Sequence, residues 1–267
     1  MTDTAAHADV VLPATTQLEH MDAVFSWGHH YVTWNERAIE PRGEAHPNTE
    51  IFRLIAAHMG LDDPAFRETD EEMLERLFAD RPAGIAMEEI RERGFAKIDL
   101  GQGPLPHAEG GFGTETGRLS FRTAWLEEAG IDPLPHYDPP AEAATPNGYP
   151  LALLTPKTHL FLNSTFANQS RQHSAQPKPF VVVNPADAAA RGVEEGSRVR
   201  VFNGRGSFLC EAHVSDDARE GVVVSPMGWW NGDYEDGRSA QTTTSQELTK
   251  LGSAPVFNDN RVEVEPA

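Results

Sequence analysis

Apolar side chains in the first half of the chain recur mainly at helical spacing. Residues 48–59 carry them at positions separated by three, four and eight residues, with Asn48 as a candidate N-cap and Gly60 beyond the last turn. This pattern predicts a helix. A capping box at Thr69–Glu72 predicts a second helix that runs to about Phe78. Residues 84–93 are predicted to form a third helix, so this half is expected to be rich in helices.

Two short segments of the same half are predicted to be strands. Residues 8–13 form an apolar run closed by proline, and residues 117–123 alternate between polar and apolar side chains. Residues 124–129 are predicted to form a short helix. A strand so close to Met1 favours a chain that begins inside a domain, because a domain usually has elements before its first strand. The first half is therefore expected to be a partial α/β domain.

A proline-rich segment separates the two halves. Residues 133–150 contain six prolines among eighteen residues, which disfavours regular structure and predicts a linker. Beyond it, six short β-branched runs bounded by turn residues predict a barrel or a sandwich: 149–154, 180–183, 197–202, 207–214, 221–226 and 261–264. Residues 184–191, with Asn184 as the N-cap, are predicted to form a short helix. The expected domains are 1–132, a linker at 133–149, and 150–267.

Charge and composition exclude several classes of protein. The 41 acidic and 22 basic residues give a net charge of −19, which disfavours a nucleic-acid partner. No apolar run approaches the roughly 20 residues of a membrane helix, so no membrane span is expected. The single cysteine, Cys210, excludes an internal disulfide framework and a CxxC zinc site. Without a secretory signal the expected location is the cytoplasm by default, and export would have to be directed by a region before residue 1.

The charge is unevenly distributed. Residues 155–205 contain seven basic and three acidic side chains, a local net charge of +4 within an acidic chain. This window could bind an anionic ligand, but a solvated surface of the same composition is more common. Charge alone leaves both alternatives open.

Two polar clusters follow predicted strands. Thr155 and Lys157 come directly after the first strand of the second half, and residues 163–165 (Asn-Ser-Thr) follow six residues later. Lysine, hydroxyl and backbone N–H groups together can bind phosphate. Residues 242–246 (TTTSQ) form the second cluster. Such loops are also ordinary turn chemistry, so ligand binding remains a hypothesis at this point.

Other candidate chemistry is weaker. His20, His29 and His30 lack the spacing of metal ligands, and no metal site is predicted in this chain. No GxGxxG fingerprint or GxSxG nucleophile elbow is present. Trp229 and Trp230 are expected to close one end of the barrel or to form the wall of a ligand pocket.

Five segments, spread in order over most of the chain, resemble the C-terminal part of molybdopterin-dependent oxidoreductases of the dimethyl sulfoxide reductase superfamily. The segments are residues 2–22, 37–61, 161–168, 184–206 and 244–265. The resemblance implies a partial α/β domain followed by a mainly β, double-psi-like barrel. This barrel would bind bis(molybdopterin guanine dinucleotide) with molybdenum. The cofactor-binding residues carried over from the family's motifs are Thr155, Lys157, Asn163, Ser164, Thr165, Ser245 and Gln246.

The resemblance also implies what this chain lacks. The molybdenum ligand of the family, and an iron–sulfur cluster if a member has one, would lie before residue 1. The chain is then expected to contribute the cofactor-capping part of an oxidoreductase that transfers oxygen atoms or electron pairs, and to be inactive alone. It would be a fragment, or a subunit whose partner is the N-terminal portion of the enzyme. A stand-alone cofactor-binding module or an unrelated acidic scaffold remain the alternatives.

Overall fold

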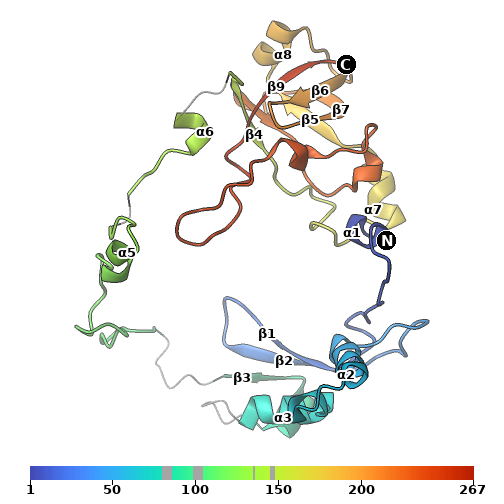
Figure 1. The fold of residues 1–267 in the computed structure, drawn as a ribbon, viewed down its shortest axis with the longest axis vertical. Helices are drawn as coiled ribbons and strands as arrows, with labels where there is room; N and C mark the ends of the chain where they lie inside the picture. Colours follow the sequence, from blue (N-terminus) through green and yellow to red (C-terminus); the bar gives the residue numbers. More distant parts are fainter. Residues whose placement is uncertain (80–85, 99–104, 135, 145–147) are drawn as a thin grey trace. The chain divides into compact units, whose positions relative to one another are not determined.

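The computed structural model describes residues 1–79, 86–98, 105–134, 136–144 and 148–267. The chain folds into two compact units (Figure 1). The smaller unit is Asp9–Leu119, and the larger unit is Ser120–Ala267 together with Met1–Ala8. A mixed α/β region is therefore followed by a β-barrel, as expected. The domain limits expected from the sequence stay a prediction.

The smaller unit packs helices against one face of an antiparallel three-stranded sheet. Its elements are β1 (Asp22–Phe25), β2 (Tyr31–Asn35), α2 (Asn48–Met59), η1 (Pro64–Phe66), α3 (Asp70–Ala79), α4 (Met87–Arg93) and β3 (Phe95–Lys97). Val32 and Ala96 on the inner face of the sheet pack with Leu74, Phe78 and Ile90 of the helices. This core buries the apolar faces of α3 and α4.

The helices predicted in this unit form, with one difference in capping. Helix α2 has the expected bounds and ends at Gly60 with φ 69°, but Asn48 is its first residue and Pro47 precedes it without a side-chain cap. The predicted N-cap role of Asn48 was therefore wrong. The capping box is confirmed, since Glu72 N donates to Thr69 Oγ1 at 3.2 Å and Thr69 N donates to the Glu72 carboxylate at 2.7 Å. The bond from Thr69 N lowers the pKa of Glu72. Helix α4 begins at Met87, and residues 84 and 85 of the predicted helix lie outside the described residues.

A buried carboxylate organises the loop before β1. Glu19 is only 5% exposed. Its Oε2 accepts hydrogen bonds from Thr16 N at 2.7 Å and Thr16 Oγ1 at 3.0 Å, and its Oε1 accepts one from Arg42 N at 2.8 Å. These donors, above all the backbone N–H of Thr16, lower the pKa of Glu19.

The two strands predicted in the first half were wrong. In residues 8–13, Val10 and Leu12 are 74% and 56% exposed, and the segment follows the short helix α1 (Asp3–Ala6). Residues 117–123 form bends and irregular backbone, with Phe121 76% exposed. A strand requires a ladder of backbone hydrogen bonds with a neighbouring strand. In the described part of the chain these segments make only isolated backbone bonds, such as His46 N to Pro13 O at 3.1 Å and Thr123 N to Pro133 O at 3.0 Å. The predicted helix that follows is confirmed as α5 (Ala124–Glu128).

The six predicted strands of the second half close into a barrel, which decides between barrel and sandwich. They are β4 (Leu151–Leu154), β5 (Phe180–Val183), β6 (Arg198–Phe202), β7 (Ser207–Val214), β8 (Val222–Val224) and β9 (Arg261–Pro266). The strand order is β4-β8-β5-β7-β6-β9, and β9 pairs with β4 to close it. The pairs β4/β8 and β5/β7 are parallel and the other four are antiparallel.

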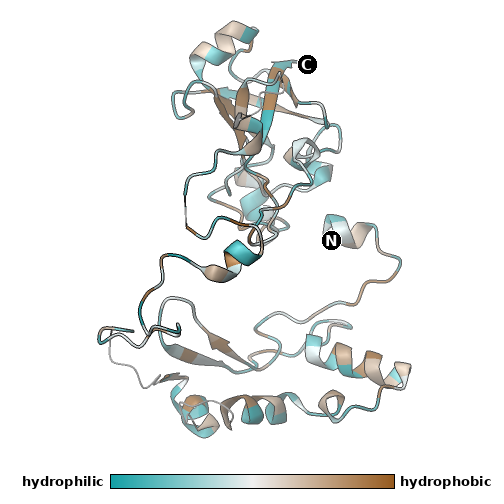
Figure 2. Cartoon of the chain, turned by 60° about the vertical axis from the view of Figure 1, so that its left-hand side comes forward, coloured by the Kyte–Doolittle hydropathy of each residue, from teal (hydrophilic) through white to brown (hydrophobic). Residues whose placement is uncertain are grey.

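The barrel interior is filled by alternate residues of these strands. Phe208, Val199, Val201 and Val223 are fully buried at 0% exposure, and Figure 2 shows hydrophobic residues along the barrel strands. Trp229 is buried in the same core, where it packs edge-to-face on Phe161. Of the two roles expected for this tryptophan, the structure therefore supports the aromatic plug.

The larger unit also contains short helices before and between the barrel strands. They are α6 (Ala141–Ala144), α7 (Ser170–Ala175), α8 (Pro185–Arg191), η2 (Asn231–Asp233) and η3 (Ala240–Thr243). Helix α8 is capped as predicted, since Asn184 Oδ1 accepts from Ala186 N at 2.9 Å. Helix α6 lies within the predicted linker, of which residues 135 and 145–147 are outside the described residues. Its Glu142 is bonded to the barrel through Arg261 N at 2.7 Å. Every helix in the described ranges is too short or too polar to span a lipid bilayer.

Candidate functional site

A cavity of about 890 Å³ lies at one end of the barrel. Strands β4 and β8 are parallel and β9 is antiparallel to β4, so β4 and β8 end where β9 begins. The loops at this end provide the lining of this barrel cavity. The lining residues are Thr155, Pro156, Lys157, Asn163, Met227, Gln241, Thr244, Ser245, Gln246, Glu247, Leu248, Pro255, Phe257 and Asn258.

Five of the seven predicted site residues come together in this lining. Thr155, Lys157 and Asn163 follow β4, and Ser245 and Gln246 follow η3, about 80 residues later in the chain. Ser164 and Thr165 do not line the cavity. The cofactor contacts expected of all seven stay a prediction.

Thr155 contributes a buried hydroxyl that needs a partner. The residue is only 3% exposed, and no group in the described part of the chain forms a hydrogen bond with its Oγ1. Burying an unsatisfied hydroxyl costs about 1–3 kcal/mol. Native structures keep few such groups, so this hydroxyl fits a ligand with a hydrogen-bonding oxygen or nitrogen.

Lys157 contributes a positive charge that no described residue neutralises. Its backbone is held beside Met227, whose N donates to Pro156 O at 2.8 Å. The Lys157 side chain forms no ion pair with any residue in the described ranges. An ammonium and a hydroxyl that line one cavity, neither of them with a side-chain partner among the described residues, form a donor set that suits phosphate oxygens.

The other cations of the basic window are mostly neutralised, which supports a solvated surface for them. Five form ion pairs with acidic residues from outside the window: Lys178 with Glu211, Arg191 with Glu263, Arg198 with Glu235, Arg200 with Glu265, and Arg205 with Glu142. Arg171 does not line the barrel cavity. Of the seven cations in this window, Lys157 is therefore the one that brings a positive charge into the cavity lining.

A tight turn presents Asn163. Backbone hydrogen bonds of 3.1 and 3.0 Å join Leu162 and Thr165 in both directions, and Asn163 has φ 54°. Asparagine tolerates this left-handed conformation better than most residues. The turn places Asn163 in the cavity lining and leaves Ser164 and Thr165 exposed.

The second polar cluster supplies another part of the lining. Ser245 is half-buried, and its Oγ accepts from Glu247 N at 3.3 Å. Gln241, Thr244 and Asn258 also line the cavity but were not among the predicted site residues. Thr244 belongs to the polar cluster 242–246, whereas Asn258 reaches the cavity only through the return of the chain into β9.

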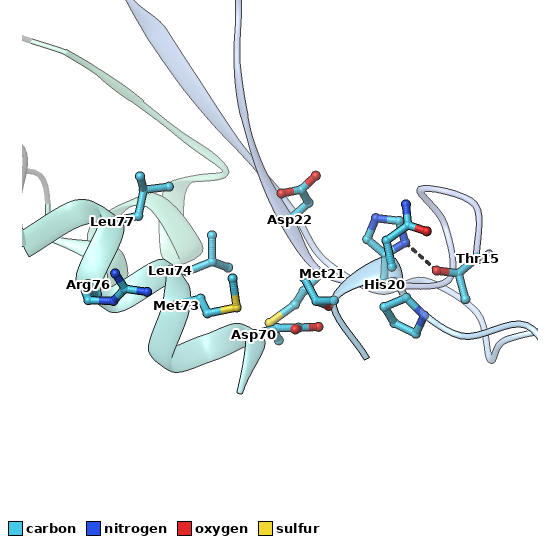
Figure 3. Close-up of a pocket in the computed structure, with 12 residues that line it drawn as sticks. Thr15, His20, Met21, Asp22, Asp70, Met73, Leu74, Arg76 and Leu77 are labelled. Carbon is cyan, nitrogen blue, oxygen red and sulfur yellow. Dashed lines mark hydrogen bonds between the residues drawn. The ribbon is translucent and has the colours of Figure 1, made fainter. Parts of the chain in front are cut away.

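The smaller unit contains a cavity of a different character, of about 520 Å³. Figure 3 shows Met73 and Leu74 of α3 on one side and His20 on the other, with His20 Nδ1 bonded to Thr15 Oγ1 at 2.9 Å. Asp70 in this lining is paired with Arg53 at 2.9 Å. The described residues contain no cluster of His, Cys, Asp or Glu suited to a metal ion. Because Asp22 and Asp70 place two carboxylates in this lining, the cavity of the smaller unit suits an anionic ligand less well than the barrel cavity does.

Comparisons with known proteins give the family to which this chain is similar. Residues 151–261 match the family model of the molydopterin dinucleotide binding domain, and residues 1–58 match that of the molybdopterin oxidoreductases. The probable oxidoreductase YoaE of Bacillus subtilis (strain 168) is 32% identical over 99% of this chain and 38% of its own length. Dimethyl sulfoxide reductase DmsA of Escherichia coli (strain K12) is 30% identical over 99% of this chain and 36% of its own length.

A solved structure shows the same fold. Acetylene hydratase from Pelobacter acetylenicus superposes with a TM-score of 0.83 at 23% sequence identity, over 100% of this chain and 39% of that protein. The chain thus spans less than two fifths of the length of each of these relatives.

Proposed function

Because the chain belongs to the molybdopterin oxidoreductases of the dimethyl sulfoxide reductase superfamily and matches their C-terminal portion, we propose that its barrel cavity binds and caps molybdopterin guanine dinucleotide. The chain contains the dinucleotide-binding domain of this family. The observation that carries the proposal is the buried Thr155 hydroxyl, which has no partner among the described residues. It lines the same cavity as Lys157, which forms no ion pair within the part of the chain that the structure describes.

Each part of the lining has a role that suits this ligand. Lys157 would neutralise a diphosphate as a point charge, and Thr155 would donate a hydrogen bond to it. Asn163, Ser245 and Gln246 carry amide and hydroxyl groups that can bond the edges of a guanine or a pterin. The barrel core beneath holds these loops in place.

When bound, the molybdenum cofactor would supply oxygen-atom or two-electron transfer. This chain would contribute binding, orientation and exclusion of water. The partner would be the remaining part of such an oxidoreductase, on the same or a separate chain.

Guanosine diphosphate is a direct probe of the cavity. Calorimetric titration of the full chain is expected to show binding that Lys157→Ala weakens by about tenfold or more, because a charge-assisted contact contributes about 1.5–3 kcal/mol. Lys178→Ala is the matched control, since Lys178 lies near Glu211 and outside the cavity lining. Equal affinities of wild type and Lys157→Ala would contradict the proposal.

A module that binds cofactor without catalysis is the second candidate, and the same polar lining supports it. The two candidates differ in where the cofactor is retained. Molybdenum and pterin should be bound only after assembly with the rest of the fold if the chain is part of an enzyme. Retention by the chain alone would favour the independent module.

A further inference from the structure

The loop that leads from η3 to β9 is closed at its base by buried polar side chains. Residues 244–259 of this loop supply more than half of the residues that line the barrel cavity. The base consists of Thr243, at 0% exposure, and Asn260, at 3%. Asn260 Nδ2 donates to Thr243 Oγ1 at 2.8 Å, so the two ends of the loop are bonded directly to each other.

Two side chains from the turn between β6 and β7 reach both ends of this loop. Asn203 Nδ2 donates to Thr243 O at 2.8 Å and to Asn260 Oδ1 at 3.1 Å. Arg205 repeats the same pair of contacts, from Nε to Thr243 O at 2.7 Å and from Nη2 to Asn260 Oδ1 at 3.1 Å. We call Asn203, Arg205, Thr243 and Asn260 the loop clasp.

The clasp is itself held from outside. Asn203 Oδ1 accepts from the backbone N of Arg205 at 2.9 Å. Arg205 Nη1 pairs with Glu142 Oε1 at 2.6 Å, and the Glu142 side chain is only 13% exposed. Asn260 O accepts from Leu153 N at 2.9 Å, which ties the base of the loop to β4 shortly before Thr155. The loop 244–259 and the end of β4, which both contribute to the cavity lining, are therefore connected to the same hydrogen-bonded cluster.

We propose that Asn203 and Arg205 are positioning residues for the nucleotide diphosphate: they fix both ends of the 244–259 loop and so hold its lining residues ready to bind. The inference rests on the proposed function of the cavity. Neither residue lines the cavity, so each would act through the loop. A loop whose ends are already fixed loses less conformational freedom on binding, and affinity rises accordingly.

Arg205→Lys in the full chain tests the clasp. Lysine keeps a positive charge for Glu142, but a single ammonium cannot reproduce the planar fork that reaches Thr243 O and Asn260 Oδ1 together. We expect amide hydrogen exchange of residues 244–259 to become about tenfold faster. Guanosine diphosphate should bind about tenfold more weakly, while exchange in the β5–β7 core is unchanged.

Arg200→Lys is the matched control, because Arg200 also uses two guanidinium nitrogens, on Glu265 of β9, away from the cavity. It should change neither measurement. Asn203→Asp is a second variant that keeps the acceptor for Arg205 N and loses the donor to Thr243 O, and it should act like Arg205→Lys.

The outcomes separate the two proposals. If Arg205→Lys and Asn203→Asp both bind guanosine diphosphate as tightly as wild type does, the positioning role of the clasp is wrong. The assignment of the cavity as the nucleotide site is not affected by that result. A wild-type chain that binds no guanosine diphosphate would overturn the proposed function, and the positioning role with it.

Discussion

Valine in place of Thr155 is expected to stabilise the chain and to weaken its binding of guanosine diphosphate. The two side chains have nearly the same shape, and both are β-branched, as suits the end of strand β4. The change removes a hydroxyl that is buried and has no hydrogen-bond partner in the described part of the protein. Opposite effects on stability and affinity are the signature of a polar group kept for a ligand.

The magnitude follows from the cost of an unsatisfied group. Removal of such a buried hydroxyl should increase the free energy of unfolding by about 1–3 kcal/mol. In a unit of this size each kcal/mol raises Tm by about 2–4 °C. The lost hydrogen bond to a charged phosphate should reduce affinity by about tenfold or more.

The assay combines thermal unfolding without ligand and calorimetric titration with guanosine diphosphate. Thr243→Val is the matched control, since its hydroxyl is equally buried but donates to Ala240 O at 2.7 Å and accepts from Asn260 Nδ2 at 2.8 Å. This control should lower Tm, because it leaves the Asn260 donor without its acceptor. A Thr155→Val variant with lowered Tm, or with unchanged affinity, would refute the reasoning.

Two further predictions concern stability. Because Thr16 N–H lowers the pKa of Glu19 below its ordinary value of 4.5, this carboxylate stabilises the smaller unit at neutral pH, and the stabilisation should be lost as pH falls below 4.5 and through the lowered pKa. Denaturant unfolding from pH 7 to pH 3 should show a smaller decline for Glu19→Gln than for wild type; equal declines would contradict the assignment. Gly206→Ala should destabilise the barrel by about 1–3 kcal/mol, since a Cβ there would lie 2.7 Å from Thr242 O. Gly204→Ala, whose nearest contact would be 3.6 Å, should cost much less, and equal losses in thermal unfolding would argue against the close approach at Gly206.

Several elements of this protein are determined by short-range patterns in the sequence. The capping box at Thr69–Glu72 and the Asn184 cap of α8 were predictable because each cap bonds only two or three residues away. The six barrel strands were predictable from their β-branched runs and turn residues. The strand predicted at residues 8–13 failed for the complementary reason, since an apolar run becomes a strand only when a distant segment pairs with it.

The candidate site divides in the same way. The sequence indicated polar loops after β4 and near residue 245 and, through family resemblance, the ligand they would bind. Only the tertiary structure decided that these loops meet, because the closure of β9 onto β4 brings the two ends of the barrel domain together. Burial then leaves Thr155 without a partner and Lys157 without a counter-ion among the described residues, while carboxylates outside the basic window neutralise most of its other cations. Local residue types set which groups could bind a ligand, and long-range strand pairing set which of them are free to do so.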